Sequence, residues 1–273
     1  MDKKALFFDI DGTLVSFNTH SIPASTTQAI AAARAEGHKI FIATGRPPAI
    51  INNLGDLQER GLIDGYVTMN GAYCFAGEEV LYKNPIPHAD VVRMAEFCRE
   101  RGYACIFVRE RSMAVYQKND EVKRVFGTML HVPGIPDTDF EEAVSGEVYQ
   151  MTPFFGSDAE EDARALLPGC EFGRWYPSFV DITAPGTTKA HGVESVMKHY
   201  GMSMADAVTF GDGGNDIPML RAAGTGVAMG NAGEEVKASA DMVTKSVDDG
   251  GIAYALLRLG LTGPKQEENE IVI

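Results

Sequence analysis

The sequence predicts an α/β protein built around a doubly wound parallel sheet. Near both ends of the chain, short apolar runs alternate with segments of helical periodicity, whereas the middle mixes hairpins with helices. Polar and glycine-rich residues follow most of these apolar runs, and ligands bind at the corresponding edge of such sheets. We therefore expect a Rossmann-like core formed by residues 1–82 and 186–273, with an α+β cap domain inserted at 83–185.

The first part of the chain follows the order strand, helix, strand, helix, strand. Apolar runs predict buried strands at 4–8, 39–43 and 66–69. A helix is expected over 23–36, where Gly37 ends the apolar periodicity, and another is expected to begin at Pro47. Because parallel strands need crossover helices, this order predicts a parallel sheet.

In the middle of the chain, strands and helices no longer alternate regularly. Strand segments at 72–75 and 80–82 flank Gly77 and predict a hairpin. Helices are expected at 88–101, 121–130 and 159–167. Further strands are expected near 103–108, 113–116, 148–155, 171–175 and 179–183. Aromatic and basic residues are frequent here, and packed core is their commoner role, so none is assigned to a site.

After Pro185, helices and strands alternate again. Helices are expected at 189–200, 217–223 and 251–259. Strands are expected at 207–210, 226–229 and 242–244. The segment after Thr262 is polar until 271–273 and predicts a mobile tail.

Composition narrows the classes of function. The chain has 273 residues and a formal net charge of −14, which argues against a nucleic-acid partner because like charges repel. Its four cysteines lack metal-site spacing and are expected as free thiols in a reducing compartment. No apolar run is long enough for a membrane span or a signal peptide, so we expect a cytoplasmic protein without a membrane partner. The oligomeric state is not predicted.

The first strong motif is Asp9-Ile10-Asp11-Gly12-Thr13, directly after the first predicted strand. Alternation along a strand places Asp9 and Asp11 on the same side. Two neighbouring carboxylates repel each other unless a cation or a proton is shared between them. An Asx-type turn that simply ends the strand is the alternative explanation.

The second strong motif is Gly211-Asp212-Gly213-Gly214-Asn215-Asp216, between a predicted strand and a helix. Carboxylate and amide oxygens in a glycine-rich turn are the hard ligands that Mg²⁺ accepts. An ordinary turn with a helix cap is the alternative.

Two weaker signals also lie where an oxyanion would bind. Thr44-Gly45-Arg46 ends the second predicted strand, and its hydroxyl and free backbone amides suit phosphate, although a capping threonine is equally compatible. Lys189 begins a predicted helix, where its charge opposes the helix dipole, although an exposed lysine in water is the commoner case. All these segments cluster around one predicted sheet, which favours a single site.

At these motifs the chain resembles the haloacid dehalogenase-like (HAD) superfamily, and within it the Cof-type sugar-phosphate phosphatases. The resemblance implies that Asp9 attacks phosphorus and that Asp11 acts as the acid and base. It also implies a Mg²⁺ cofactor held by the Asp9 and Asp212 carboxylates and by the Asp11 backbone carbonyl, with Asp216 supporting that shell. The phosphate-binding residues that it implies are Thr44, Gly45, Arg46, Asn70, Lys189 and Asn215.

The expected function is therefore Mg²⁺-dependent hydrolysis of a small phosphorylated metabolite, with sugar phosphates favoured, through an aspartyl-phosphate. A carboxylate at Asp11 favours turnover by water, and the absence of long apolar segments argues against an ion pump. A phosphomutase or phosphotransferase is the first alternative. A phosphosugar-binding module without turnover is the second, although such a module would not need both Asp9 and Asp11.

Overall fold

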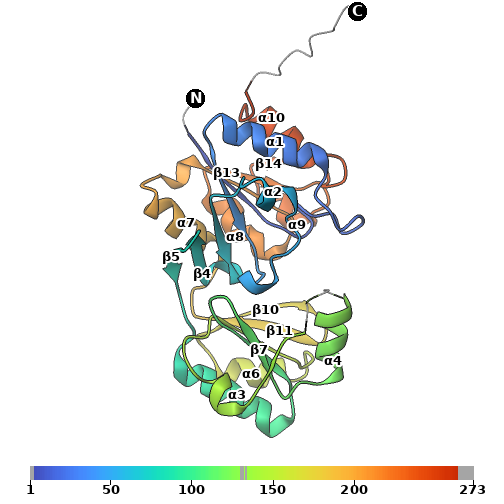
Figure 1. Ribbon diagram of the computed structural model, residues 1–273, viewed down its shortest axis with the longest axis vertical. Coiled ribbons are helices and arrows are strands. Elements are labelled where there is room, and N and C mark those ends of the chain that lie inside the picture. Colours follow the sequence, from blue (N-terminus) through green and yellow to red (C-terminus); the bar gives the residue numbers. More distant parts are fainter. Residues whose placement is uncertain (1–2, 130–131, 133, 264–273) are drawn as a thin grey trace, which may run out of the picture. The chain divides into compact units, whose positions relative to one another are not determined.

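The computed structural model describes residues 3–129, 132 and 134–263, which form two compact units (Figure 1). The first unit contains the chain up to Ile42, the segment Asn53–Tyr66 and the chain from Tyr200 onward. The second contains Ala43–Asn52 and Val67–His199. The predicted α/β class is confirmed. The domain boundaries expected at 83 and 185 stay a prediction, and the expected tail lies largely outside the described residues.

The larger sheet has the strand order β14-β13-β12-β1-β2-β3-β4-β5. Its strands are β1 (Ala5–Phe8), β2 (Lys39–Ala43), β3 (Gly65–Thr68), β4 (Tyr73–Ala76), β5 (Glu79–Lys83), β12 (Ala207–Gly211), β13 (Thr225–Ala228) and β14 (Met242–Val243). β1 pairs in parallel with both β2 and β12, and β13 continues the parallel array to β14. The hairpin expected around Gly77 is present as the antiparallel pair β4 and β5.

The centre of the first unit is β1, which is completely buried. Phe7 stacks on Phe41 of β2 with ring centroids 4.8 Å apart, and Phe8 stacks on Phe210 of β12 at 4.6 Å. Central strands of parallel sheets are covered on both faces, which explains why the run is apolar throughout. Because burial holds β1 in place, it also fixes the position of Asp9, the first residue after the strand.

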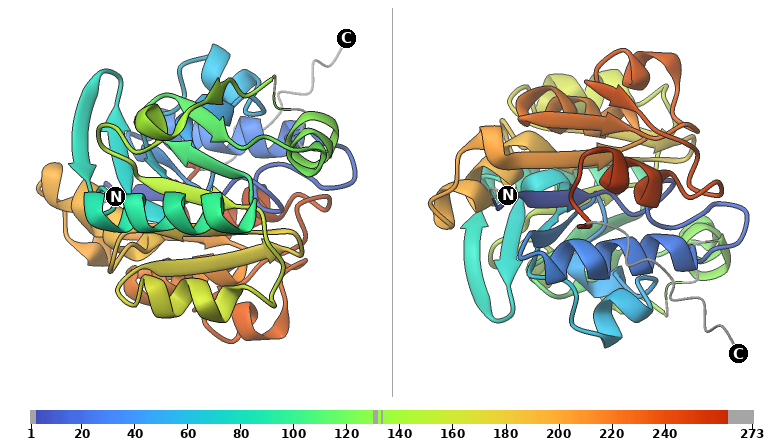
Figure 2. Two further views of the ribbon diagram at one scale, coloured as in Figure 1. Left: turned by 90° about the horizontal axis from the view of Figure 1, so that it is seen from below. Right: turned by 90° about the horizontal axis from the view of Figure 1, so that it is seen from above.

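Helices complete the first unit. α1 (Ala24–Ala35) and α10 (Gly251–Arg258) pack against each other, as the right-hand view of Figure 2 shows. α8 (Ile217–Ala222) packs against β12 and β13, and α9 (Glu234–Lys237) is a short helix that the sequence did not predict.

The helix expected from Pro47 is wrong. Only a 3-10 turn forms there, at Pro48–Ile50, and the four-residue α2 (Asp56–Glu59) follows separately. Two consecutive prolines remove amide donors, and Gly55 with a φ of 43° interrupts the helical path.

The second unit contains a smaller sheet with the order β10-β11-β9-β6-β7-β8. Its strands are β6 (Cys105–Val108), β7 (Met113–Tyr116), β8 (Asp137–Thr138), β9 (Gln150–Pro153), β10 (Glu171–Tyr176) and β11 (Phe179–Thr183). The helices of the second unit are α3 (His88–Arg101), α4 (Asp120–Val122), α5 (Phe140–Ala143), α6 (Glu160–Leu166) and α7 (Lys189–His199). β8 and α5 were not predicted. The helix expected over 121–130 is α4 followed by a π-helical segment at Lys123–Met129, and residue 130 lies outside the described residues.

The two faces of the smaller sheet differ. α3 and α6 cover one face, where Met94 packs in one apolar cluster with Phe107 and Met151 (Figure 2, left). The opposite face carries a second cluster that includes Ile106 and Phe179. Side chains that alternate along the strands therefore pack into one apolar cluster on each face of the sheet.

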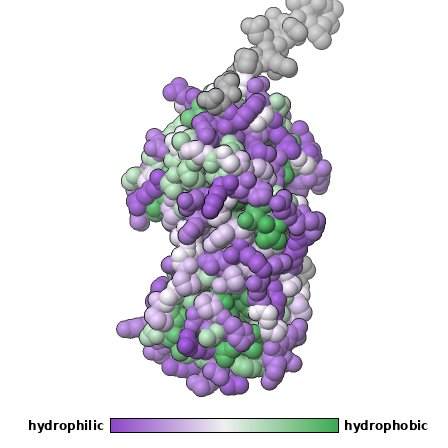
Figure 3. All heavy atoms as spheres, turned by 90° about the vertical axis from the view of Figure 1, so that its left-hand side faces the viewer, coloured by the Kyte–Doolittle hydropathy of each residue, from purple (hydrophilic) through white to green (hydrophobic). Residues whose placement is uncertain are grey.

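Hydrophilic residues cover most of the face drawn in Figure 3, in keeping with a net charge of −14. Within the described part of the chain, no helix combines the length and the apolar character needed to cross a membrane.

Candidate active site

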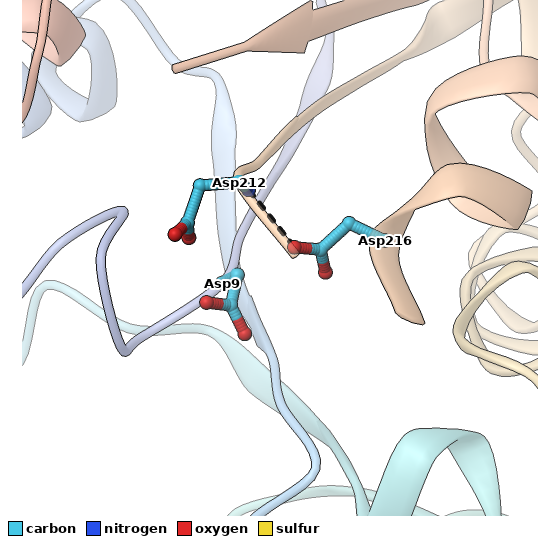
Figure 4. A group of neighbouring side chains, drawn as sticks. All are labelled: Asp9, Asp212 and Asp216. Atoms are coloured by element: carbon cyan, nitrogen blue, oxygen red, sulfur yellow. Dashed lines mark hydrogen bonds between the residues drawn. The ribbon is translucent and has the colours of Figure 1, made fainter. Parts of the chain in front are cut away.

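Three aspartates meet at the carboxyl ends of neighbouring parallel strands. Asp9 directly follows β1, Asp212 directly follows β12, and Asp216 ends a 3-10 turn that leads into α8. Because Phe8 pairs with Phe210, the chain leaves both strands at the same level of the sheet. One carboxylate oxygen from each aspartate lies within 4.8 Å of the other two, and Figure 4 shows the three side chains gathered in one place.

The charge of this cluster points to a cation. Asp9 is only 7% exposed and Asp216 is fully buried. Carboxylates held this close and away from water repel each other unless a cation or a proton compensates them. An all-oxygen set of carboxylates fits a hard divalent cation such as Mg²⁺ and does not favour softer metals.

Asp216 holds the loop that carries Asp212. Its Oδ2 accepts a hydrogen bond from the backbone amide of Asp212 at 3.0 Å (Figure 4). The same oxygen accepts a second hydrogen bond, from the backbone amide of Gly213 at 2.9 Å. A Cβ on Gly211 would lie 2.4 Å from the Cβ of Asp216, so only glycine fits at that position. The glycines of the motif thus allow Asp216 to close the turn.

The Asp212 side chain is also held from the other side, by two residues that sequence reasoning missed. Thr13 Oγ1 donates to Asp212 Oδ1 at 2.8 Å. Asn231 Nδ2 donates to the Gly12 carbonyl at 2.8 Å and lies 3.4 Å from Asp212 Oδ2, while Asn231 Oδ1 accepts from the Val247 amide. Asn231 follows β13, so its place after a third parallel strand was a signal available in the sequence.

The other predicted residues of the first unit lie outside the carboxylate cluster. Asp11 is partly exposed and forms a β-bridge with Val15. Its carboxylate is not among the three that gather, which is compatible with a metal contact through its backbone carbonyl. Asn215 is exposed, with its Oδ1 close to Gly213.

The phosphate-binding segments predicted around Thr44 and Asn70 adjoin each other in the second unit. The Asn70 amide donates to the Thr44 carbonyl at 3.1 Å, and the Met69 amide donates to the Arg46 carbonyl at 3.3 Å. A Cβ on Gly45 would lie 3.3 Å from the Asn70 amide group. Asn70 has a φ of 54°, a left-handed conformation that asparagine tolerates better than most residues.

The Thr44 and Arg46 side chains form hydrogen bonds within their own loop. Thr44 Oγ1 accepts from the Arg46 amide at 3.0 Å, which closes a small turn, and Thr44 is 1% exposed. The Arg46 guanidinium donates to the Ile50 carbonyl at 3.2 Å. The turn therefore fixes the direction of the backbone after β2.

Lys189 lies at the first position of α7 and is completely buried, so it is not the exposed lysine that its sequence context alone favours. Thr188 caps this helix by accepting from the His191 amide at 3.2 Å. A Cβ on Gly71 would lie 2.2 Å from the Thr188 carbonyl, so the Asn70-Gly71 segment packs directly against the start of α7. Buried lysines require anionic or hydrogen-bonding partners, which suits a residue that binds phosphate.

The cysteines do not offer an alternative nucleophile. Cys74, Cys98 and Cys105 are buried free thiols. Burial raises the pKa of the Cys170 thiol to about 11, with smaller contributions from nearby carboxylates. Thiols with raised pKa values remain protonated and unreactive at neutral pH.

Comparison with known proteins agrees with this geometry. A sequence profile of haloacid dehalogenase-like hydrolases matches residues 6–256. The putative phosphatase YkrA of Bacillus subtilis (strain 168) is 37% identical over 262 residues, which cover 96% of this chain and 99% of YkrA. The pyridoxal phosphate phosphatase YbhA of Escherichia coli (strain K12) is 29% identical, over 89% of this chain and 93% of YbhA. The solved structure of the HAD subclass IIB sugar phosphatase BT4131 is 57% identical with a TM-score of 0.88, and the match covers 95% of this chain and 100% of that one.

The chain therefore belongs to the haloacid dehalogenase-like hydrolase family. The predicted class of enzyme, a phosphatase of this family, is confirmed.

Proposed function

We propose that the protein hydrolyses small phosphate monoesters, sugar phosphates foremost, with Mg²⁺ and through an aspartyl-phosphate on Asp9. The observation that carries the proposal is the cluster of Asp9, Asp212 and Asp216 carboxylates within 4.8 Å of one another at the ends of adjacent parallel strands. Such a cluster would hold a divalent cation next to the Asp9 carboxylate, which directly follows the buried strand β1.

The chemistry proceeds in two steps. In the first, an Asp9 carboxylate oxygen forms a bond to phosphorus while the bond to the ester oxygen breaks, and Asp11 donates a proton to that leaving oxygen. In the second, a water molecule attacks the phosphorus of the aspartyl-phosphate, Asp11 takes its proton, and Asp9 and inorganic phosphate are released. Mg²⁺, held by the Asp9 and Asp212 carboxylates and the Asp11 carbonyl, would neutralise the negative charge that these groups and the phosphate bring together.

The phosphoryl oxygens need donors of positive or polar character. We assign this role to Thr44, the Gly45 amide, Asn70 and Lys189. Support comes from the direct packing of the Asn70 segment against the start of α7 and from the burial of Lys189. Arg46 and Asn215 are assigned a secondary role, because Arg46 is bonded to a local carbonyl and Asn215 is exposed.

The relatives support the proposed substrate class. BT4131 is a sugar phosphatase and YbhA is a pyridoxal phosphate phosphatase, so both act on small phosphorylated molecules. A small phosphorylated metabolite in the cytoplasm is therefore the proposed substrate, and the net charge of −14 supports the absence of a nucleic-acid partner.

The test is phosphate release from a panel of monoesters by the purified protein, with Mg²⁺ and then with excess chelator, beside an Asp9→Asn variant. We expect release that requires both Mg²⁺ and Asp9. Release that is unchanged by the chelator or by the variant would contradict the proposed mechanism. Transfer of phosphate to an added sugar in place of water would identify a phosphotransferase.

A further inference from the structure

Trp175 is a large aromatic residue that is both exposed and tightly held. It is the only tryptophan of the chain, and it is 56% exposed on β10. Its ring lies edge-on against Phe179, with centroids 4.7 Å apart, and its Nε1 donates to Asp181 Oδ2 at 2.8 Å. An exposed indole that only filled space on the surface would need no such anchor.

The backbone is shaped to place this ring. The pairing of β10 with β11 changes register between Gly173 and Tyr176, so Trp175 lies within an irregularity of the β-bulge type. Arg174 anchors this irregularity by donating to the Pro177 and Phe179 carbonyls, each at 3.0 Å, and to Glu160 at 2.6 Å. Bulges re-aim single side chains and are frequent beside functional sites.

Asp181 is the buried end of a polar network. It is 8% exposed, and besides the Trp175 hydrogen bond its Oδ1 accepts from Thr152 Oγ1 at 2.7 Å. Burial raises the pKa of Asp181, and the hydrogen bonds from Thr152, Trp175 and Gln150 offset this only in part. A buried carboxylate is costly, and an apolar residue would fill the same space more cheaply.

The network also contains an acceptor without a donor. Gln150 is 3% exposed and its Nε2 donates to Thr152 Oγ1 at 3.2 Å, but no group among the described residues donates to its Oε1. Buried acceptors are nearly always satisfied. This oxygen has almost no exposed surface, so a ligand hydroxyl can donate to it only after the Gln150 side chain rotates.

We propose that Trp175 is a stacking platform for the sugar ring of the substrate, and that Asp181, Thr152 and Gln150 form the polar group that orients the platform and accepts a ring hydroxyl. The apolar face of a sugar ring packs on an indole, and its hydroxyls supply the donors that this group lacks. The inference rests on the proposed function and names the part of the substrate that carries no phosphate.

The position of the platform within the second unit supports this role. Phe179, which carries the Trp175 ring, belongs to the same hydrophobic cluster as Met69. Met69 directly precedes Asn70, one of the residues assigned to phosphate. One continuous cluster thus supports both the platform and a phosphate-binding segment.

The first experiment uses Trp175 as its own reporter, because no other tryptophan contributes to the emission. Asp9→Asn protein in Mg²⁺, which should not turn over substrate, is titrated with glucose 6-phosphate, and separately with ethyl phosphate and inorganic phosphate. We expect a saturable blue shift with glucose 6-phosphate alone, since only that probe covers the indole. An equal shift with inorganic phosphate would overturn the assignment, because it would make Trp175 a reporter of phosphate alone.

The second experiment compares kcat/KM for glucose 6-phosphate with kcat/KM for ethyl phosphate. Trp175→Ala should lower this ratio about tenfold, and Trp175→Phe, which keeps a ring, should lower it less. Gln150→Met, which removes the acceptor at similar volume, should also lower it. Tyr254→Ala is the matched control, since it removes an exposed aromatic ring from α10, and should leave the ratio unchanged.

The outcomes separate the two proposals. If wild type hydrolyses both esters, yet the Trp175→Ala ratio and the emission do not change, the platform is wrong and the phosphatase mechanism stands. If no ester is hydrolysed but glucose 6-phosphate still shifts the emission, the platform stands and the proposed mechanism is wrong.

Discussion

The two units bury carboxylates in opposite ways. In the first unit, Asp9, Asp212 and Asp216 gather three like charges within 4.8 Å. In the second, Asp181 is a single carboxylate surrounded by the neutral donors Thr152 and Trp175. Binding a cation would relieve the repulsion in the first cluster, whereas Asp181 belongs to a network of neutral hydrogen-bonding groups that holds an aromatic ring in place. The partners of a buried charge therefore indicate what it is for.

Among variants that keep the nucleophile Asp9, the largest effect is expected at Asp11, whose carboxylate is not part of the cluster. Asp11→Asn should lower kcat by about 10²–10⁴-fold, because the carboxamide can neither donate the proton to the leaving group nor accept one from water. Since the proposed metal contact of Asp11 is its backbone carbonyl, the Mg²⁺ concentration for half-maximal activity should change little. Measuring kcat across a Mg²⁺ titration tests both, and unchanged turnover would contradict the acid and base role.

The next effect is expected at Asp216, which satisfies two backbone amides of the loop. Asp216→Ala leaves both amides without this acceptor and should lower the free energy of unfolding by about 2–4 kcal/mol. Asp216→Asn keeps an acceptor oxygen and should cost much less stability, while both variants weaken Mg²⁺ binding. Denaturant unfolding with and without Mg²⁺ distinguishes them. Equal loss of stability in the two variants would show that the charge of Asp216, and not its acceptor, holds the loop.

Much of the fold could be predicted because its strongest signals are local. The expected strand 39–43 and helix 88–101 have the bounds that the structure shows. The predictions fail where a helix or strand is short, or where packing in the folded protein determines the backbone geometry. The four-residue α9 offers too little sequence for periodicity. The π-helical segment Lys123–Met129 carries Val125 and Phe126, which pack into the core cluster of the second unit, and periodicity alone does not predict its geometry.

The candidate site shows the same division. Asp9, Asp212 and Asp216 lie in two continuous motifs after apolar strands, so the sequence indicated them directly. Asn231 lies in a separate loop, and its hydrogen bond to Gly12 joins positions more than two hundred residues apart. The bond between Trp175 and Asp181 depends on a register shift between two strands, which no motif marks. The geometry of such pairs arises only on folding.

A smaller effect is expected at Asn231, which holds Gly12 and lies close to Asp212. Asn231→Ala should weaken Mg²⁺ activation about tenfold while kcat at saturating Mg²⁺ falls less, because groups behind metal ligands act mainly on affinity. Thr13→Val should resemble it, since it removes the other donor to Asp212. A loss of kcat with unchanged Mg²⁺ activation would assign Asn231 to the reaction itself.

The smallest effect tests the hydrogen-bond network around Asp181 through the dependence of stability on pH. Burial raises the pKa of Asp181 in the folded protein, so folding favours the protonated carboxyl and the ionised form costs stability at neutral pH. As the pH falls through the folded pKa toward the unfolded value, this cost disappears. Wild type should therefore gain stability relative to Asp181→Asn on acidification, by about 2–4 °C in Tm if the cost is near 1 kcal/mol.

The exposed Asp120 provides the matched control for this last prediction. A hydrogen bond from Lys123 lowers the pKa of Asp120, so its ionised form is favoured on folding. Wild type should therefore lose stability relative to Asp120→Asn as the pH falls, which is the opposite sign. Thermal unfolding of the three proteins from pH 7 to about pH 3 measures both trends, because the Asp181 trend lies above the usual aspartate pKa of about 3.9 and the Asp120 trend lies mostly below it. A difference between wild type and Asp181→Asn that does not vary with pH would mean that Asp181 is held by its neutral donors with no net cost of ionisation.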